Sequence, residues 1–191
     1  VVPALVTKWD NPNDLTWRFY LNSTAKFSNG DSLTAADVKF TFDYLANNKV
    51  LPLGLGAAIP SVDSVNIVDD HTVEFVTRTA DPILLNRLAS VFMVLSKKDV
   101  EANGLKTHLG SGPYVITSQS DLAIVLTRNE NYWGKKPKVK TITYKAITDS
   151  DKISALLNGT VDFISYGYTN DESAKITLLE QNSSFETAKA L

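Results

Sequence analysis

The chain has 191 residues, of which 43% are hydrophobic and 21% charged, and this composition excludes fibrous and wholly disordered classes. The formal net charge of −2 provides no basic footprint for a nucleic-acid backbone, so no nucleic-acid partner is expected. The sequence contains no cysteine, which excludes disulfides, thiolate nucleophiles and cysteine-based metal sites.

The first quarter of the sequence predicts two strands and a helix. Alternating apolar and polar residues predict strands over about 3–9 and 15–22, joined by a polar turn. Thr34 is a suitable N-cap residue, and Asp37 stands at the third position of the helix that would follow it. Apolar residues at helical spacing continue this helix until Asn47.

The middle of the sequence predicts a hairpin followed by two helices. Runs rich in β-branched residues over 61–68 and 72–79 flank a polar turn that contains His71. The pattern then predicts a helix opening at Asp81-Pro82, a short buried strand over 91–95, and a helix over 97–102 capped by Ser96.

The remaining residues predict further strands and two more helices. In chain order these are a hairpin over 113–118 and 122–128, a strand over 139–147, a helix over 151–158 and a strand over 161–164. A helix over about 171–181 and a strand near Phe185 follow. Strands therefore flank a helix-containing middle. We expect a mixed α/β (α+β) fold, in which a mixed sheet formed by 1–30 and 106–191 is interrupted by an inserted α+β subdomain over 31–105.

The residue types that carry catalysis are poorly represented. His71 is expected in a hairpin turn and His108 in a glycine-bounded loop, and neither belongs to a zinc-ligand motif. Gly110-Ser111-Gly112 lacks the spacing of a nucleophile elbow and is interpreted as a tight turn. Trp17 is expected in the core and Trp133 as a buried loop anchor. No catalytic residue, metal site or cofactor is predicted.

Five segments carry a family resemblance. They are LTWRFYL at 15–21, KFSNGDSLTAADV at 26–38, GSGPY at 110–114, RNENYWGKKP at 128–137 and ALLNGTVDFI at 155–164. In order and spacing they resemble the family 5 extracellular solute-binding proteins, which are the peptide- and nickel-binding receptors of bacterial ABC importers. The resemblance implies a two-lobed fold like that of periplasmic binding proteins, whose lobes close on a ligand by hinge motion.

The same resemblance implies where the protein acts and what it contacts. Residues 1–191 are expected to form most of the first lobe, as a single lobe cut from a longer chain, because Val1 is not an initiator Met. The implied partners are a peptide or small solute and the transmembrane subunits of an ABC permease. The implied location is the periplasm or the extracellular face of the cytoplasmic membrane, with a lipid anchor on an upstream segment as one arrangement.

The resemblance leaves two ligand classes open. Segments 26–30 and 128–136 look like the nickel-importer branch, but the arginine and tryptophan with which that branch surrounds its metal chelate have no counterpart at 50–54 or 91–94. An apolar lining suits a peptide that is recognised through its backbone. Oligopeptide or dipeptide is therefore the favoured solute, and nickel or a metal chelate is the alternative.

Five residues are expected to contact the ligand. Ser165, Tyr166 and Tyr168 follow the segment at which chains of this family leave the first lobe, and Phe92 and Met93 are weaker candidates. Because one lobe supplies only part of the contacts, the 191-residue chain alone is expected to bind solute weakly. An enzyme and a protein-interaction module without solute binding are the alternatives from other functional classes.

Overall fold

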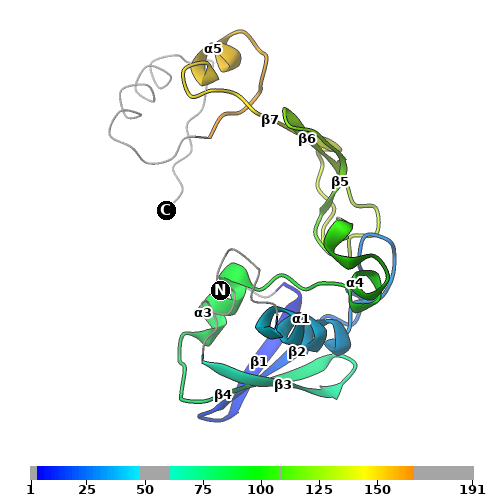
Figure 1. Cartoon of the computed structure of the whole chain (residues 1–191), viewed down its shortest axis with the longest axis vertical. Coiled ribbons are helices and arrows are strands. Elements are labelled where there is room, and N and C mark those ends of the chain that lie inside the picture. The colour runs from blue at the N-terminus through cyan, green and yellow to red at the C-terminus, as the bar shows by residue number, and fades with distance from the viewer. Residues whose placement is uncertain (1–3, 48–60, 108, 166–191) are drawn as a thin grey trace. The chain divides into compact units, whose positions relative to one another are not determined.

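The computed structural model describes residues 4–47, 61–107 and 109–165. The chain divides into two compact units, Val1–Tyr144 and Lys145–Leu191, which are described separately. Helices and antiparallel strand pairs alternate along the described residues (Figure 1). This arrangement confirms the expected mixed α/β class.

The first unit contains a four-stranded sheet with the strand order β1-β2-β4-β3 (Figure 1). Its strands are β1 (Val6–Asn13), β2 (Thr16–Leu21), β3 (Val62–Asp69) and β4 (Thr72–Thr77). All three neighbouring pairs are antiparallel, and the four predicted strands are confirmed with shifted ends. The boundary predicted at residue 30 thus lies between strands of one sheet.

One face of this sheet packs against helix α1 (Ala35–Asn47) to form the hydrophobic core. The ring of Phe75 on β4 contacts Phe19 on β2 edge-to-face at 5.4 Å and Phe42 on α1 at 6.3 Å, measured between ring centroids. Trp17 is half-buried against the same core, as its alternating position predicts. Alternation with a period of two therefore places Phe19 and Leu21 of β2 and Val73 and Phe75 of β4 on the face that packs against α1.

Helix α1 begins at a capping arrangement between Thr34 and Asp37. The backbone N–H and the hydroxyl of Thr34 both donate to Asp37 Oδ2, at 2.9 and 3.2 Å. The position of the cap is as predicted, but the Thr34 hydroxyl donates to the carboxylate, which is a stronger acceptor than a neutral group. Asp37 Oδ1 accepts the backbone N–H of Lys97 at 2.9 Å, so the same side chain also reaches the following helix.

Two helices follow the sheet, α3 (Leu84–Val91) and α4 (Lys97–Asn103), and α4 continues into the short helix η1 (Gly104–Lys106). Ser96 caps α4 as predicted, because its hydroxyl oxygen accepts the N–H of Asp99. The strand predicted over 91–95 is wrong: α3 extends through Val91, and the next four residues are neither helix nor strand. The backbone N–H of Leu95 instead bonds the side chain of Thr41 on α1 at 2.9 Å.

The second sheet has the order β5-β6-β7 and comprises β5 (Tyr114–Gln119), β6 (Ala123–Arg128) and β7 (Thr141–Lys145). A tightly bonded loop follows β6. Asn129 is 2% exposed, and its side chain donates to the carbonyl of Gly112, while the indole N–H of Trp133 donates to the carbonyl of Ser111. Trp133 is thus a partly buried loop anchor, as expected.

The second unit contains helix α5 (Lys152–Leu157). Gly159 follows the helix with φ of +73°, a left-handed conformation that glycine adopts without steric cost. The strand predicted over 161–164 is wrong, because the N–H of Val161 turns back to the carbonyl of Ala155 on α5. The helix predicted over about 171–181 and the strand near Phe185 lie outside the described residues.

Within residues 4–47, 61–107 and 109–165, no helix is both long and apolar enough to cross a membrane.

The shared carboxylate of Asp37 allows a direct test. Replacing Asp37 with alanine leaves the backbone N–H groups of Thr34 and Lys97 without their acceptor at a buried position. We expect the Asp37→Ala variant to lose about 2 to 3 kcal/mol of unfolding free energy, measured by urea titration. The matched control Asp121→Ala, in an exposed turn, should lose less than about 0.5 kcal/mol. Equal losses in the two variants would contradict this role of Asp37.

Candidate functional site

The first unit contains an apolar cavity of about 440 Å³ between the sheet, α1 and α3. All the described residues that line it are aliphatic or aromatic. They include residues of β1, β4, α3 and the segment after α3, namely Trp9, Phe75, Leu85, Leu88, Phe92 and Val94. A cavity of this size and lining accommodates an apolar group rather than a charged one, because a charge would lose its hydration without gaining a partner.

Phe92 and Met93 are adjacent but have opposite surroundings. Phe92 is half-buried and lines the cavity, and its ring meets Phe75 edge-to-face with the centroids 5.8 Å apart. Met93 is 79% exposed, so its side chain has almost no packing role within the described residues. Of these two predicted contacts, only Met93 is a large apolar side chain that the described structure leaves unburied.

Helix α1 holds the segment that carries these two residues. The hydroxyl of Thr41 donates to the carbonyl of Asp37 at 2.7 Å and accepts the N–H of Leu95 at 2.9 Å. Two residues later, the N–H of Lys97 donates to the carboxylate of Asp37. These bonds fix the segment from its C-terminal side, while the bond from the N–H of Phe92 to Leu88 fixes it to the end of α3.

The other three predicted contacts belong to the second unit. Ser165 is exposed, and its carbonyl accepts a hydrogen bond from Lys152 Nζ at 3.3 Å. Tyr166 and Tyr168 lie outside the described residues. The predicted set is therefore divided between the two units, with Phe92 and Met93 in the first and Ser165 in the second.

Sequence reasoning missed the other lining residues of the apolar cavity. Leu85 and Leu88 lie three positions apart on α3, a spacing that places both on one face of a helix. That spacing was a usable signal for a core-facing helix. The cavity itself has no sequence signal, because it depends on how closely α3 approaches the sheet.

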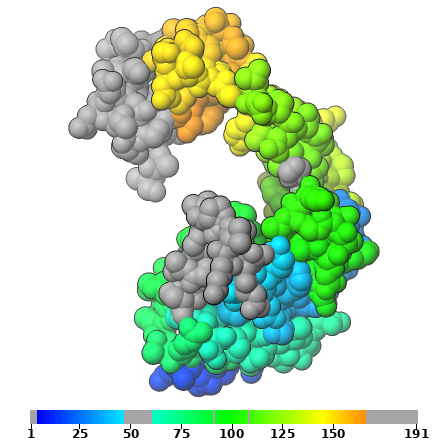
Figure 2. All heavy atoms as spheres, viewed as in Figure 1, coloured from blue at the N-terminus to red at the C-terminus, as the bar shows by residue number. Residues whose placement is uncertain are grey.

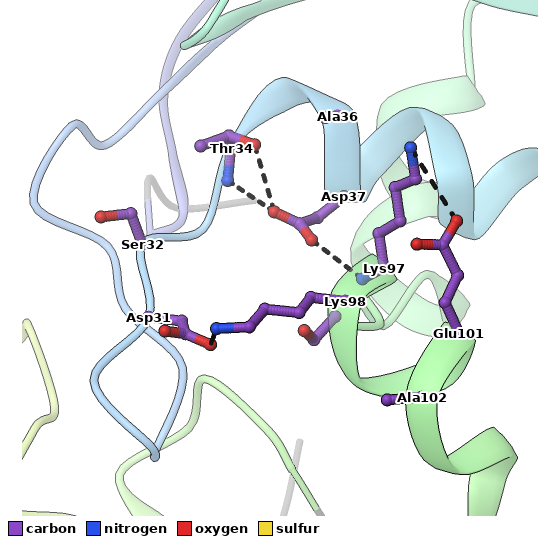
Figure 3. Close-up of a pocket in the computed structure, with 10 residues that line it drawn as sticks. Asp31, Ser32, Thr34, Ala36, Asp37, Lys97, Lys98, Glu101 and Ala102 are labelled. Atoms are coloured by element: carbon purple, nitrogen blue, oxygen red, sulfur yellow. Dashed lines mark hydrogen bonds and ion pairs between the residues drawn. The ribbon is translucent and has the colours of Figure 1, made fainter.

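A second, polar cavity of about 550 Å³ lies between the 31–34 loop, α1 and α4 (Figure 3). Its charged groups pair with one another: Lys98 Nζ lies 3.0 Å from Asp31 Oδ2, and Lys97 Nζ lies 3.9 Å from Glu101 Oε1. Hydrogen bonds from Lys98 and then Asn29 lower the pKa of Asp31. The ion pair between Lys98 and Asp31 connects the loop to α4. Because the charges of the polar cavity are already compensated, this cavity is a weaker candidate for ligand binding than the apolar one.

His71 is the histidine that the structure describes, and it joins no metal-binding group of the described residues. His71 lies in the turn between β3 and β4, where its backbone N–H donates to Asp69 at 2.8 Å and lowers the pKa of that carboxyl. His108 lies outside the described residues. Within 4–47, 61–107 and 109–165, no three His, Cys, Asp or Glu side chains gather closely enough to hold a metal ion.

Comparison with known proteins identifies a matching family and similar proteins. The family model described as bacterial extracellular solute-binding proteins, family 5 Middle, matches residues 1–188. The nickel-binding periplasmic protein of Escherichia coli K12 is 32% identical over 176 residues, which cover 87% of this chain and 33% of that protein. A putative ABC transporter peptide-binding protein of Brucella ovis is 30% identical over 174 residues, covering 85% and 32%.

Solved structures share the fold. The binding protein MoaA of A. tumefaciens R10, solved with mannopinic acid, matches with a TM-score of 0.83 and 26% identity over 94% of this chain and 37% of its own. The Escherichia coli murein tripeptide binding protein MppA matches with a TM-score of 0.81 and 23% identity, covering 93% and 39%. At that identity, the second likeness concerns the fold alone.

The relatives differ in the ligand that they are named for. The chain spans about a third of the length of the curated relatives that it matches. The family model extends over nearly every residue of the chain. The chain belongs to the bacterial extracellular solute-binding proteins, family 5.

Proposed function

We propose that this chain is part of the substrate-capturing receptor of an ABC importer, which binds an oligopeptide or dipeptide between two lobes and delivers it to a membrane permease. The observation that carries the proposal is the family match over residues 1–188. Relatives named as ABC transporter peptide-binding proteins support the importer and the solute class. The proposal includes no catalytic step, consistent with a family of binding proteins.

The apolar cavity favours a peptide over a metal chelate. The described residues that line it include no charged or imidazole group, whereas an apolar side chain of a bound peptide could be buried against them without leaving an unpaired charge. Nickel or a metal chelate is the second candidate, because the Escherichia coli relative is named as nickel-binding and is 32% identical. Both candidates use the same receptor mechanism.

That mechanism depends on differential contacts. A solute that touches both lobes stabilises the closed receptor relative to the open one, and only this difference in affinity shifts the population. The permease would then recognise the closed state. The proposed location is the periplasm or the outer face of the cytoplasmic membrane, in line with relatives that are periplasmic proteins.

The solute class can be read from the intact receptor. We expect mass spectrometry of the full-length protein, purified without denaturation, to detect a mixture of short peptides released on acidification. Release of nickel or a metal chelate would support the second candidate. If nothing is released and the receptor binds its permease equally with and without added solute, the protein is an interaction module, and the proposal of solute capture is wrong.

The 191-residue chain by itself provides a second test. It carries only a part of the contacts in a two-lobed receptor, so we expect isothermal titration calorimetry to detect little or no binding of the solute found above. The full-length receptor, titrated under the same conditions, is the positive control. Binding of comparable affinity by the isolated chain would show that closure of a second lobe is not required.

Substitutions at Phe92 and Met93 should distinguish a packing role from a role in solute contact. Because Phe92 contacts Phe75 at the edge of the core, we expect Phe92→Ala to lower the unfolding free energy by about 2 kcal/mol. Met93→Ala should change it by less than about 0.5 kcal/mol but weaken solute binding by the full-length receptor about fivefold. Unchanged solute affinity in Met93→Ala would remove this residue from the proposed site.

A further inference from the structure

The loop between β6 and β7 contains a concentration of positive charge that solute capture does not explain. Residues Lys135–Lys140, referred to below as the lysine segment, read KKPKVK and contain four lysines. No acidic residue lies among them, although the chain as a whole carries a formal charge of −2. The surface of the first unit therefore has a local charge opposite in sign to that of the whole chain.

Hydrogen bonds to neighbouring strands hold the backbone of the lysine segment. Arg128 Nη1 donates to the carbonyl of Pro137 at 3.2 Å. The backbone N–H of Arg128 donates to the carbonyl of Lys140 at 2.8 Å. The hydroxyl of Tyr114 on β5 donates to the carbonyl of Val139 at 3.0 Å. The segment has no regular secondary structure, yet its backbone is fixed at three of its last four residues.

The nearest acidic side chain neutralises only one of the four lysines. Glu130 Oε1 accepts from Arg128, and Glu130 Oε2 pairs with Lys136 at 3.1 Å, which together lower the pKa of Glu130. Lys135, Lys138 and Lys140 are exposed and have no ion-pair partner among the described residues. Figure 2 shows this yellow-green part of the chain at the molecular surface.

The type of cation indicates the kind of partner. Lysine is a compact, strongly hydrated point charge, whereas arginine makes the planar, paired hydrogen bonds that suit a shaped site. Protein–protein interfaces are enriched in arginine and depleted in lysine. All three unpaired cations here are lysines, and Val139 between two of them is 56% exposed. This combination fits a diffuse anionic surface with a shallow apolar boundary better than a protein surface.

We propose that the lysine segment binds the anionic headgroups of a phospholipid bilayer and thereby holds the receptor near the membrane that contains its permease. The proposal rests on the location outside the cytoplasmic membrane given above, but not on which solute is captured. Each lysine near an anionic bilayer strengthens partitioning about fivefold, so three unpaired lysines account for about a hundredfold. Such binding is reversible and is screened by salt.

Co-sedimentation with lipid vesicles tests the proposal on the full-length receptor. We expect binding to vesicles that mix phosphatidylglycerol with phosphatidylcholine, little binding to phosphatidylcholine alone, and loss of binding at high salt. The triple variant Lys135→Gln, Lys138→Gln, Lys140→Gln should reduce the partition coefficient about a hundredfold. A matched triple variant that removes the exposed lysines Lys26, Lys97 and Lys106 changes the net charge equally and should reduce it less than about threefold.

Three outcomes would overturn the proposal. These are equal partitioning of the two triple variants, vesicle binding that persists at high salt, and a lysine-segment variant that loses binding to the detergent-purified permease while keeping vesicle binding. The last result would assign the segment to an acidic protein surface. Solute affinity, measured on the same variants, should not change, so a failure of solute capture and a failure of lipid binding are distinguished.

Discussion

The carboxylate of Asp37 is the constraint on which the arrangement of the first unit depends. It accepts hydrogen bonds from the N–H and hydroxyl of Thr34 at the start of α1 and from the N–H of Lys97 at the start of α4. A buried carboxylate requires such donors, because its desolvation is otherwise uncompensated. One side chain therefore begins one helix and positions another that lies 60 residues further along the chain.

The same constraint determines where the candidate contacts lie. Phe92 and Met93 belong to a segment without regular structure, and such a segment has no ladder of hydrogen bonds to fix it. Thr41 and Asp37 on α1 supply the missing bonds at Leu95 and Lys97. Phe92 can then pack against the sheet while Met93 projects outward, since adjacent residues in extended backbone point in opposite directions.

The sequence predicts the secondary structure well where a pattern repeats and poorly where it does not. The alternation of β2 and β4 and the caps at Thr34 and Ser96 are local signals, and each is found in the structure. The runs 91–95 and 161–164 are apolar but too short to show a period, and both were wrongly predicted as strands. Neither cavity could be predicted, because each is formed by elements that tertiary packing alone brings together.

The apolar surface around the cavity and the basic lysine segment suit different kinds of interaction. The apolar cavity and Met93 offer contacts that gain free energy only when a ligand or a second surface excludes water from them. The proposed contact of the lysine segment would act at longer range, because exposed charges interact over about 10 Å at moderate ionic strength. The proposed receptor would have to close on a solute and also find its permease, and these demands conflict if one surface serves both. In this proposal the apolar surface on α3 is separate from the basic loop after β6, so each interaction would form without the other.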